Sequence, residues 1–305
     1  MLRITFLGTA GSKPTPNRNP SAILINRDGE LMLFDCGEGT QQQMMRAKTG
    51  MMALSSIFIT HFHADHILGI PGLIQTMAFQ RRKEPLTIYG PYEIEEFTEH
   101  LFALSYRKPK FEINTIRLRA GDVIKKKDYA IHAIKTQHSV PSLGYALIEN
   151  KRKGRFNVDA ALNAGIPKGY LFSRLQQGET VTVNGKSVHP DEVIGPPRPG
   201  RTIVYSGDTL PCKEILNASK NADVLIHDAT LASDLIDWAN ETMHTTAKDA
   251  AILAKDAGVR SLILTHFSSR YDNDTTPLLN DAKQIFKNVI ASEDLMEIEV
   301  PYRDE

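Results

Sequence analysis

The sequence has little cysteine and no long apolar run, and each shortage excludes a class of protein. Cys36 and Cys212 are the only cysteines among 305 residues, too few for a disulfide framework. We therefore expect buried thiols in a reducing cytoplasm. No stretch approaches the ~20 apolar residues of a membrane span. The N-terminal apolar run meets Gly8 too soon for a signal peptide, so we expect no membrane association.

The sequence also lacks net charge, but its charges are unevenly distributed. Lys plus Arg and Asp plus Glu both number 36, so the overall charge indicates no nucleic-acid partner. Between Lys151 and Gly200, glycine and proline are frequent, and eight basic residues stand against four acidic ones. This composition predicts an insertion into the main domain. Its positive charge suits contact with phosphates, although a solvated loop would have the same composition.

The densest group of potential metal ligands follows the apolar run Ile57 to Ile59. Within six residues the chain presents His61, His63, Asp65 and His66. Imidazole and carboxylate groups at this density are typical of zinc sites. The first two histidines alternate, so in extended backbone both rings point to one side. Apolar periodicity from Ile67 to Phe79 predicts that a helix begins at this group.

Further histidines and aspartates recur at the ends of predicted strands. They are His138, Asp208, His227, Asp228 and His266. Unrelated surface residues would not repeatedly fall at the ends of apolar runs. One zinc ion can be completed by His61, His63 and His138 and another by Asp65, His66 and His266, with Asp208 and a hydroxide shared. Two cations lower the pKa of a shared water, so we expect a hydrolytic site.

Strands and helices alternate along most of the chain, which predicts an α/β sandwich with helices outside the sheets. Predicted helices include Gln41 to Lys48, Ala247 to Ala257 and Pro277 to Lys287. Asp35 ends a predicted strand just before the first of these helices. A carboxylate at that position suits either a helix N-cap or a partner of a ligand histidine.

The stretch His61-Phe-His-Ala-Asp-His66, with His138, Asp208 and His266, resembles the metallo-β-lactamase superfamily. Within that superfamily, the whole chain resembles the short-form tRNase Z family. The resemblance rests on Asp35-Cys-Gly-Glu-Gly-Thr-Gln41, Tyr205-Ser-Gly-Asp-Thr209, His227-Asp-Ala-Thr230 with His244-Thr-Thr246, and Thr265-His-Phe-Ser-Ser-Arg-Tyr271. The chain departs from the family at Asp228, Thr245 and Pro16, where glutamate, serine and lysine are usual.

This resemblance implies a metallo-β-lactamase-like αββα sandwich over residues 1–305, with a protruding, flexible and basic tRNA-binding arm at about 150–200. It implies two Zn²⁺ per subunit and a cytoplasmic homodimer. The implied activity is a zinc-dependent endoribonuclease that removes the 3′ trailer from precursor tRNA. Cleavage would follow the discriminator nucleotide, the last one retained, and leave a 3′-hydroxyl on the tRNA.

The resemblance also implies roles for individual residues. Asp65 would be a metal ligand that also orients or deprotonates the nucleophile, while His244, oriented by Asp228, would protonate the leaving 3′-oxygen. Substrate-binding residues would be Arg18, Lys151, Arg152, Lys153, Arg155, Lys168 and Arg270. Two other hypotheses remain at this point: a zinc phosphodiesterase or sulfatase for small substrates, and an RNA-binding subunit with a vestigial site.

Overall fold

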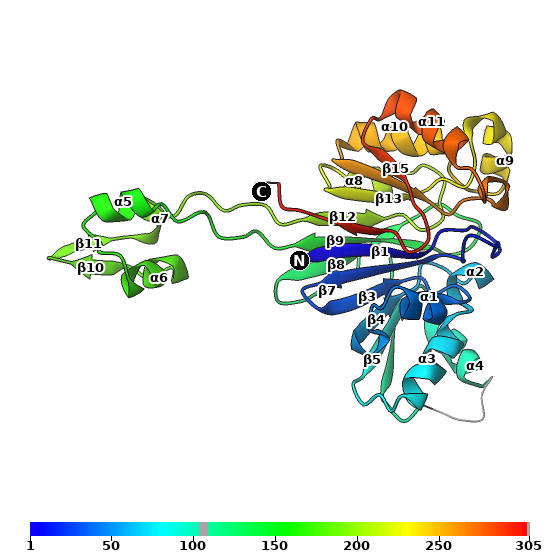
Figure 1. Ribbon diagram of the computed structural model, residues 1–305, viewed down its shortest axis with the longest axis horizontal. Helices are drawn as coiled ribbons and strands as arrows, with labels where there is room; N and C mark the ends of the chain where they lie inside the picture. The colour runs from blue at the N-terminus through cyan, green and yellow to red at the C-terminus, as the bar shows by residue number, and fades with distance from the viewer. Residues whose placement is uncertain (104–108, 304–305) are drawn as a thin grey trace. The chain divides into compact units, whose positions relative to one another are not determined.

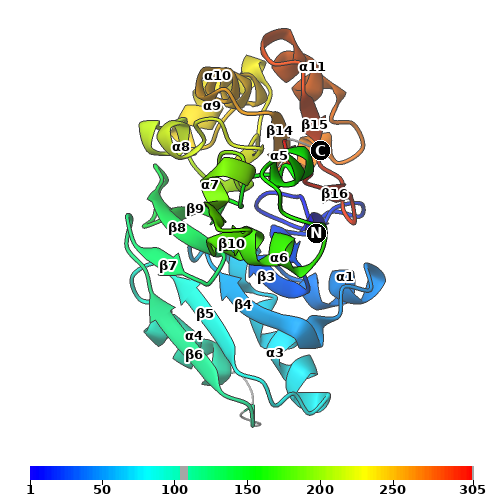
Figure 2. The same ribbon diagram turned by 90° about the vertical axis from the view of Figure 1, so that its left-hand side faces the viewer.

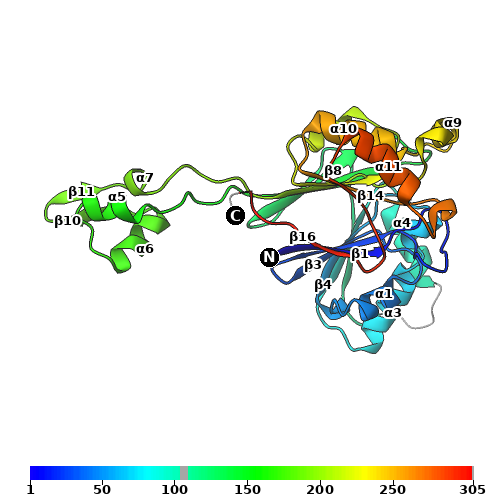
Figure 3. The ribbon, with the colours of Figure 1, turned by 45° about the horizontal axis from the view of Figure 1, so that its top comes forward.

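The computed structural model describes residues 1–103 and 109–303, and the chain forms two compact units. The larger unit comprises residues 1–148 and 201–305, and the smaller one residues 149–200. In the larger unit, two seven-stranded sheets face each other and helices cover both outer faces (Figures 1 and 3). The predicted αββα sandwich is therefore confirmed.

The first sheet carries the N-terminal strands and three helices on its outer face. Its spatial order is β16 (Glu297–Glu299), β1 (Leu2–Gly8), β2 (Ala22–Arg27), β3 (Glu30–Phe34), β4 (Leu54–Phe58), β5 (Leu86–Gly90) and β6 (Ile113–Arg117). The strands from β3 to β6 are parallel. The helices are α1 (Thr40–Arg46), α3 (Ile70–Phe79) and α4 (Ile94–Ala103).

The second sheet has helices from the C-terminal half of the chain on its outer face. Its order is β15 (Val289–Ala291), β14 (Ser261–Thr265), β13 (Val224–Asp228), β12 (Thr202–Tyr205), β9 (Leu143–Glu149), β8 (Tyr129–Lys135) and β7 (Val123–Lys125). The helices are α8 (Lys213–Ala218), α9 (Ile236–Glu241), α10 (Ala247–Ala257) and α11 (Thr276–Ile285). Figure 2 shows β7, β8 and β9 in succession beside the group of α8, α9 and α10.

Alternating side chains of the strands fill two different cores. In β2, Ile23 and Ile25 belong to the core between the sheets, whereas Leu24 packs toward the helices of the first sheet. This is the two-residue period of a strand with both faces covered. Between the sheets, the rings of Phe34 and Phe58 stack with centroids 5.0 Å apart. Both faces of each sheet are thus anchored, which holds the strand ends at fixed positions.

The predicted helices agree with the structure in three regions and differ in part in a fourth. Helix α10 matches its predicted range, and α1 and α11 each lie within two residues of theirs. The predicted helix Ile67 to Phe79 is confirmed over most of its length by α3, but the helix α2 (Ala64–Ile67) before it is separate. Between them, the Gly69 N–H donates to the Cys36 carbonyl at 2.8 Å. A β-carbon on Gly69 would lie 2.0 Å from the Gly37 carbonyl oxygen, so this close approach requires glycine.

The smaller unit has its own apolar core. It contains α5 (Val158–Asn163), α6 (Tyr170–Gln177), a hairpin of β10 (Val181–Val183) and β11 (Lys186–Val188), and α7 (Pro190–Val193). Asn184 and Gly185 connect the hairpin with positive φ angles of 50° and 78°, as a two-residue turn requires. Its buried side chains include Ala161, Leu175 and Val181. The insertion is thus a small folded unit with an exposed polar surface.

Short 3₁₀ helices complete the described structure at η1 (Met51–Ala53), η2 (Ser233–Leu235) and η3 (Ser269–Tyr271). Within residues 1–103 and 109–303, no helix combines the length and apolar character needed to cross a membrane.

Candidate metal centre

Loops that follow strands of both sheets bring the predicted ligands together. His61 and His63 follow β4 and His66 lies on α2, whereas His138, Asp208 and His266 follow β8, β12 and β14. Their ligand atoms form groups within 4.8 Å, one containing His61, His63, His138 and Asp208 and another containing Asp65, His66 and His266. The structure therefore joins all seven predicted metal ligands at one edge of the sandwich.

In the first group, the ring nitrogens of three histidines lie close to one another. His63 Nδ1 lies 3.0 Å from His61 Nε2 and 3.3 Å from His138 Nε2. His61 Nε2 lies 3.7 Å from the Asp208 Oδ2 atom. Three nitrogens and one carboxylate oxygen form a donor set typical of tetrahedral zinc.

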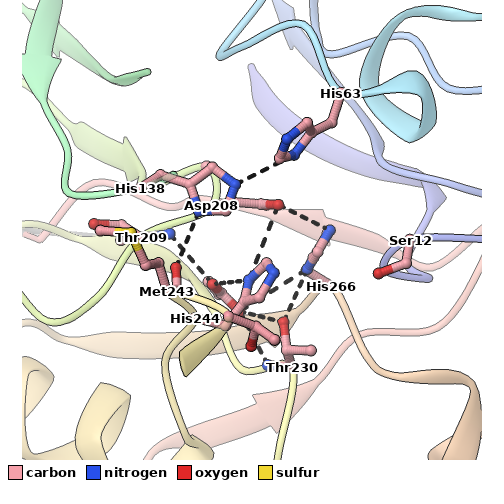
Figure 4. A network of polar contacts seen from close by, with 12 residues as sticks. Ser12, His63, His138, Asp208, Thr209, Thr230, Met243, His244 and His266 are labelled. Atoms are coloured by element: carbon pink, nitrogen blue, oxygen red, sulfur yellow. Dashed lines mark hydrogen bonds and ion pairs between the residues drawn. The ribbon is translucent and has the colours of Figure 1, made fainter. Parts of the chain in front are cut away.

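In the second group, the Asp65 carboxylate faces two histidines. Asp65 Oδ2 lies 3.5 Å from His66 Nε2 and 3.3 Å from His266 Nε2. Asp208 Oδ2 is also within reach of both nitrogens, at 3.3 and 3.2 Å. Figure 4 shows Asp208 between the rings of His138, His244 and His266.

Asp208 has one carboxylate oxygen whose environment fits a bound cation. Its Oδ1 atom is buried and has no hydrogen-bond partner among the described residues. A buried carboxylate oxygen without a donor is costly unless a cation satisfies it. Together with the two converging donor sets, this oxygen indicates that the residues fit a pair of metal ions sharing Asp208.

The outer nitrogens of four ligand histidines are held by hydrogen-bond partners. The pairs are His61 Nδ1 with Thr60 Oγ1 at 3.0 Å, His66 Nδ1 with Asp35 Oδ2 at 2.8 Å, His138 Nδ1 with the Met243 carbonyl at 3.0 Å and His266 Nδ1 with Thr230 Oγ1 at 2.9 Å. Such partners fix the orientation of each ring and direct its other nitrogen inward. Hydrogen bonds within the protein therefore set the ring orientations that metal binding would require.

Asp35 connects the two sheets beneath the site. It is fully buried and accepts hydrogen bonds from the Thr60 N–H at 2.8 Å and from the Tyr205 hydroxyl at 2.8 Å. Its φ of 56° lies in the left-handed region, as does the 63° of His266. Gly39, not Asp35, is the N-cap of α1. Of the two predicted alternatives, Asp35 is thus the partner of a histidine, His66.

Asp228 and His244 form a second buried pair. Asp228 Oδ2 lies 2.9 Å from His244 Nδ1, despite the shorter side chain of aspartate. Asp228 also accepts hydrogen bonds from Thr230 N–H and Oγ1–H and from the N–H groups of Thr209 and Thr245. Its acceptor positions are therefore occupied by donors, which favours a positioning role over metal ligation, although Asp228 and His244 also lie within a possible ligand group.

The pKa shifts of the first ligand group and of His244 suit this division of roles, whereas at His66 the effect of burial is overcome by Asp208 and Asp35, which raise its pKa. Burial lowers the pKa values of His61, His63 and His138, which favours the neutral rings that metal binding requires. Burial also acts against a proton on His244, but the adjacent Asp228 prevails and raises the pKa of His244 to about 9. Burial opposes ionisation of Asp65 as well, yet the hydrogen bond from His266 lowers its pKa.

A cleft of about 350 Å³ opens beside the ligand groups. It is lined by Gly11, Ser12, Lys13, His63, His138, Ser139, Thr230, Leu231, Trp238, Thr242, His244, Ser268 and Ser269. The Ser12 N–H donates to Asp65 Oδ2 at 2.7 Å. A substrate in this cleft would therefore meet ligands of the first group and the His244 ring together.

The predicted substrate-binding residues have different environments. Arg18 is only 8% exposed and donates to Thr9 Oγ1 and to the Ser292 carbonyl, so its guanidinium holds the proline-rich loop. This corrects the expectation of a substrate contact. Arg270 is exposed, with its guanidinium carbon 4.3 Å from the Trp238 ring centroid.

In the smaller unit, Lys151, Arg155 and Lys168 are exposed. Arg152 is half-buried, and its Nε donates to the Pro199 carbonyl at 3.5 Å. Lys153 is exposed, but its ammonium group donates to the Gln176 carbonyl at 2.8 Å. The structure thus places all five basic residues together in the insertion, outside the unit that carries the metal ligands.

The protein has the metallo-β-lactamase fold. This fold is defined here by two facing sheets with outer helices and by a His/Asp cluster at the strand ends. The family model described as Beta-lactamase superfamily domain matches residues 192–267, and the one described as Anti-Pycsar protein Apyc1 matches residues 2–164. The crystal structure of human tRNase Z, short form, is similar with a TM-score of 0.72 and 28% identity, covering 98% of this chain and 99% of that chain.

Similarity to curated proteins is higher still. Ribonuclease Z of Methanosarcina acetivorans is 64% identical over 305 residues, which is 100% of both chains. Ribonuclease Z of Myxococcus xanthus is 44% identical and covers 100% of this chain and 99% of its own. The chain belongs to the ribonuclease Z family.

Proposed function

We propose that the protein is a zinc-dependent endoribonuclease that removes the 3′ trailer from precursor tRNA. Cleavage follows the discriminator nucleotide and leaves a 3′-hydroxyl on the tRNA. The observation that carries this proposal is a complete set of converging ligands in a chain 64% identical to a ribonuclease Z. The retained ligands argue against a vestigial site.

Two zinc ions would be held by the two ligand groups, with Asp208 between them. Zinc bound there would supply Lewis-acid stabilisation of the phosphoryl oxygens and a water of lowered pKa. The protein contributes the fixed positions of the ligands, because Thr60, Asp35 and Thr230 orient three of the rings.

Asp65 has the position of a proton acceptor for the attacking water. The Ser12 N–H and His266 both contact its Oδ2 atom, so the carboxylate is held in one orientation. Its side chain keeps 10% exposure. We assign it the role of orienting the water and accepting its proton.

His244 has the position of a proton donor. Asp228 holds its Nδ1 atom, which leaves the other nitrogen of the ring for the substrate. The ring lines the cleft beside His138, with ring centroids 5.2 Å apart. We assign His244 to protonation of the leaving 3′-oxygen, with Asp228 as its positioning residue.

The basic residues of the insertion would bind the tRNA backbone. Lys151, Lys153 and Lys168 are exposed on this unit, and Arg152 and Arg155 lie beside them in sequence. We further propose that the protein acts as a cytoplasmic homodimer, in which one subunit's insertion binds tRNA cleaved by its partner. Exposed apolar residues Met45 and Phe79, at 51% and 83% exposure, support an interface on α1 and α3.

The test is incubation of metal-analysed protein with a precursor tRNA that carries a 3′ trailer, followed by mapping of the cut. We expect release of the intact trailer with a 5′-phosphate. Deleting residues 151–195 should abolish this cleavage but spare hydrolysis of a small aryl phosphodiester. If fully metallated protein hydrolyses only the small diester, it is a small-substrate phosphodiesterase instead.

A further inference from the structure

Trp238 is an aromatic side chain at the cleft to which the proposed mechanism gives no role. It is the only tryptophan of the chain, lies on α9 and is 38% exposed. Tryptophan usually buries most of its large ring, so exposure beside a reactive site calls for a ligand. Trp238 lines the same cleft as His63, His138 and His244.

The Arg270 guanidinium lies over one face of the indole ring. Its guanidinium carbon lies 4.3 Å from the ring centroid, within cation–π distance. Trp238 belongs to the described cleft lining, whereas Arg270 does not. With the cation covering one face, the indole can offer its other face to a second planar group. A nucleobase is the planar group that an RNA substrate supplies.

The connection to His244 indicates which nucleobase reaches the ring. The Thr242 hydroxyl donates to the Trp238 carbonyl at 2.8 Å, and the His244 N–H donates to the Ala239 carbonyl at 2.8 Å. These bonds hold Trp238 and His244 on one short, continuous piece of backbone. Because Trp238 and His244 also line the same cleft, a nucleoside whose 3′-oxygen approaches His244 enters the cleft that contains the indole.

We propose that Trp238, backed by Arg270, stacks on the base of the nucleotide that carries the leaving 3′-oxygen. This inference rests on the proposed function and assigns a base-binding subsite to the same cleft. A volume of about 350 Å³ is at the lower end of the ~300–1,000 Å³ typical of small-ligand pockets, which suits a nucleotide rather than a duplex. Stacking contacts only the face of a base, so the subsite accepts all four bases.

The test couples a protein change to a substrate change. Trp238→Ala should lower kcat/KM for precursor tRNA by about five- to one-hundred-fold, the range of one base–aromatic stack. With an abasic residue at the last retained nucleotide, wild type and Trp238→Ala should cleave at nearly equal rates. With the abasic residue at the first trailer nucleotide, the full loss should remain. Trp238→Phe should recover most of the activity.

Tyr92→Ala is the matched control. Tyr92 is a 59% exposed aromatic residue with Arg117 at 5.3 Å, but it does not line this cleft, so its loss should leave kcat/KM unchanged. An equal Trp238→Ala effect on intact and abasic substrates would overturn the stacking subsite, as would coupling to the trailer base. Failure of the wild type to release a trailer would instead contradict the proposed function.

Discussion

The two compact units differ in whether their charged side chains are buried or exposed. In the larger unit, buried charged groups such as Asp35, Asp208 and Asp228 lie among histidines and hydroxyls that fix their positions. In residues 149–200, by contrast, lysines such as Lys151 and Lys168 are exposed on a scaffold with a small core. The difference suits the proposed functions: chemistry needs fixed atoms, whereas recognition of a charged polymer needs accessible cations.

The comparison predicts that the largest loss follows a change of Asp208 in the larger unit. Asp208→Ala removes the carboxylate that faces both ligand groups, so every substrate should lose about 10³-fold or more in kcat. Metal analysis should show fewer bound zinc ions. Asp128→Ala, at an exposed aspartate, should change neither quantity. A metallated, active Asp208→Ala protein would remove Asp208 from the centre.

His244→Ala should lower kcat by about 10²- to 10⁴-fold, the usual contribution of a general acid. Because the His244 ring is paired with Asp228, its removal should leave the zinc content unchanged. Single-turnover kinetics with parallel metal analysis measures both effects. Loss of zinc in this variant would show that His244 is a ligand and that the assignment of roles is wrong.

Asp35→Asn tests the hydrogen-bond partner of the ligand His66. The change weakens the hydrogen bond to His66 Nδ1, so zinc affinity should fall about 10- to 100-fold in a chelator competition. Asp223→Asn is the matched control, because Asp223 is also buried but accepts from the Thr202 N–H at the start of β12. It should lower thermal stability without changing zinc affinity. Equal zinc affinities in wild type and Asp35→Asn would contradict the role of Asp35.

The smallest effect should come from replacing two lysines of the insertion. Replacing Lys151 and Lys168 with alanine should weaken tRNA binding severalfold and reduce the slope of log K against log salt by about 1 for each lysine in contact with phosphate. Hydrolysis of a small aryl phosphodiester should be unchanged. Lys125→Ala, at an exposed lysine of β7, is the control. An unchanged salt slope would place the tRNA elsewhere.

The fold and the ligand set could be predicted because both leave local patterns. Apolar runs that end in His or Asp mark buried strands and the groups at their ends. The partners of the ligands leave no such pattern: Met243 contributes a backbone carbonyl, and Thr60 and Thr230 are ordinary threonines in the sequence. Trp238 also was not predicted, because its exposure depends on how α9 packs.

Two predictions differ from the structure in part because distant segments decide the local structure. The break between α2 and α3 depends on the packing of Gly69 against Gly37. Arg18 lies in a proline-rich segment typical of a surface loop, yet its guanidinium reaches the carbonyl of Ser292 in the C-terminal part. In both cases, the decisive contact joins residues that lie far apart in the sequence, so a local pattern cannot predict it.

The division of the ligands between the sheets has a consequence for biosynthesis. His61, His63, Asp65 and His66 follow a strand of the first sheet, whereas His138, Asp208 and His266 follow strands of the second. A nascent chain that has formed only strands β1 to β6 of the first sheet therefore carries four of the seven predicted ligands. For the proposed metal centre, high-affinity metal uptake would therefore require translation past His266 and closure of the sandwich, so metal loading would report the completion of folding.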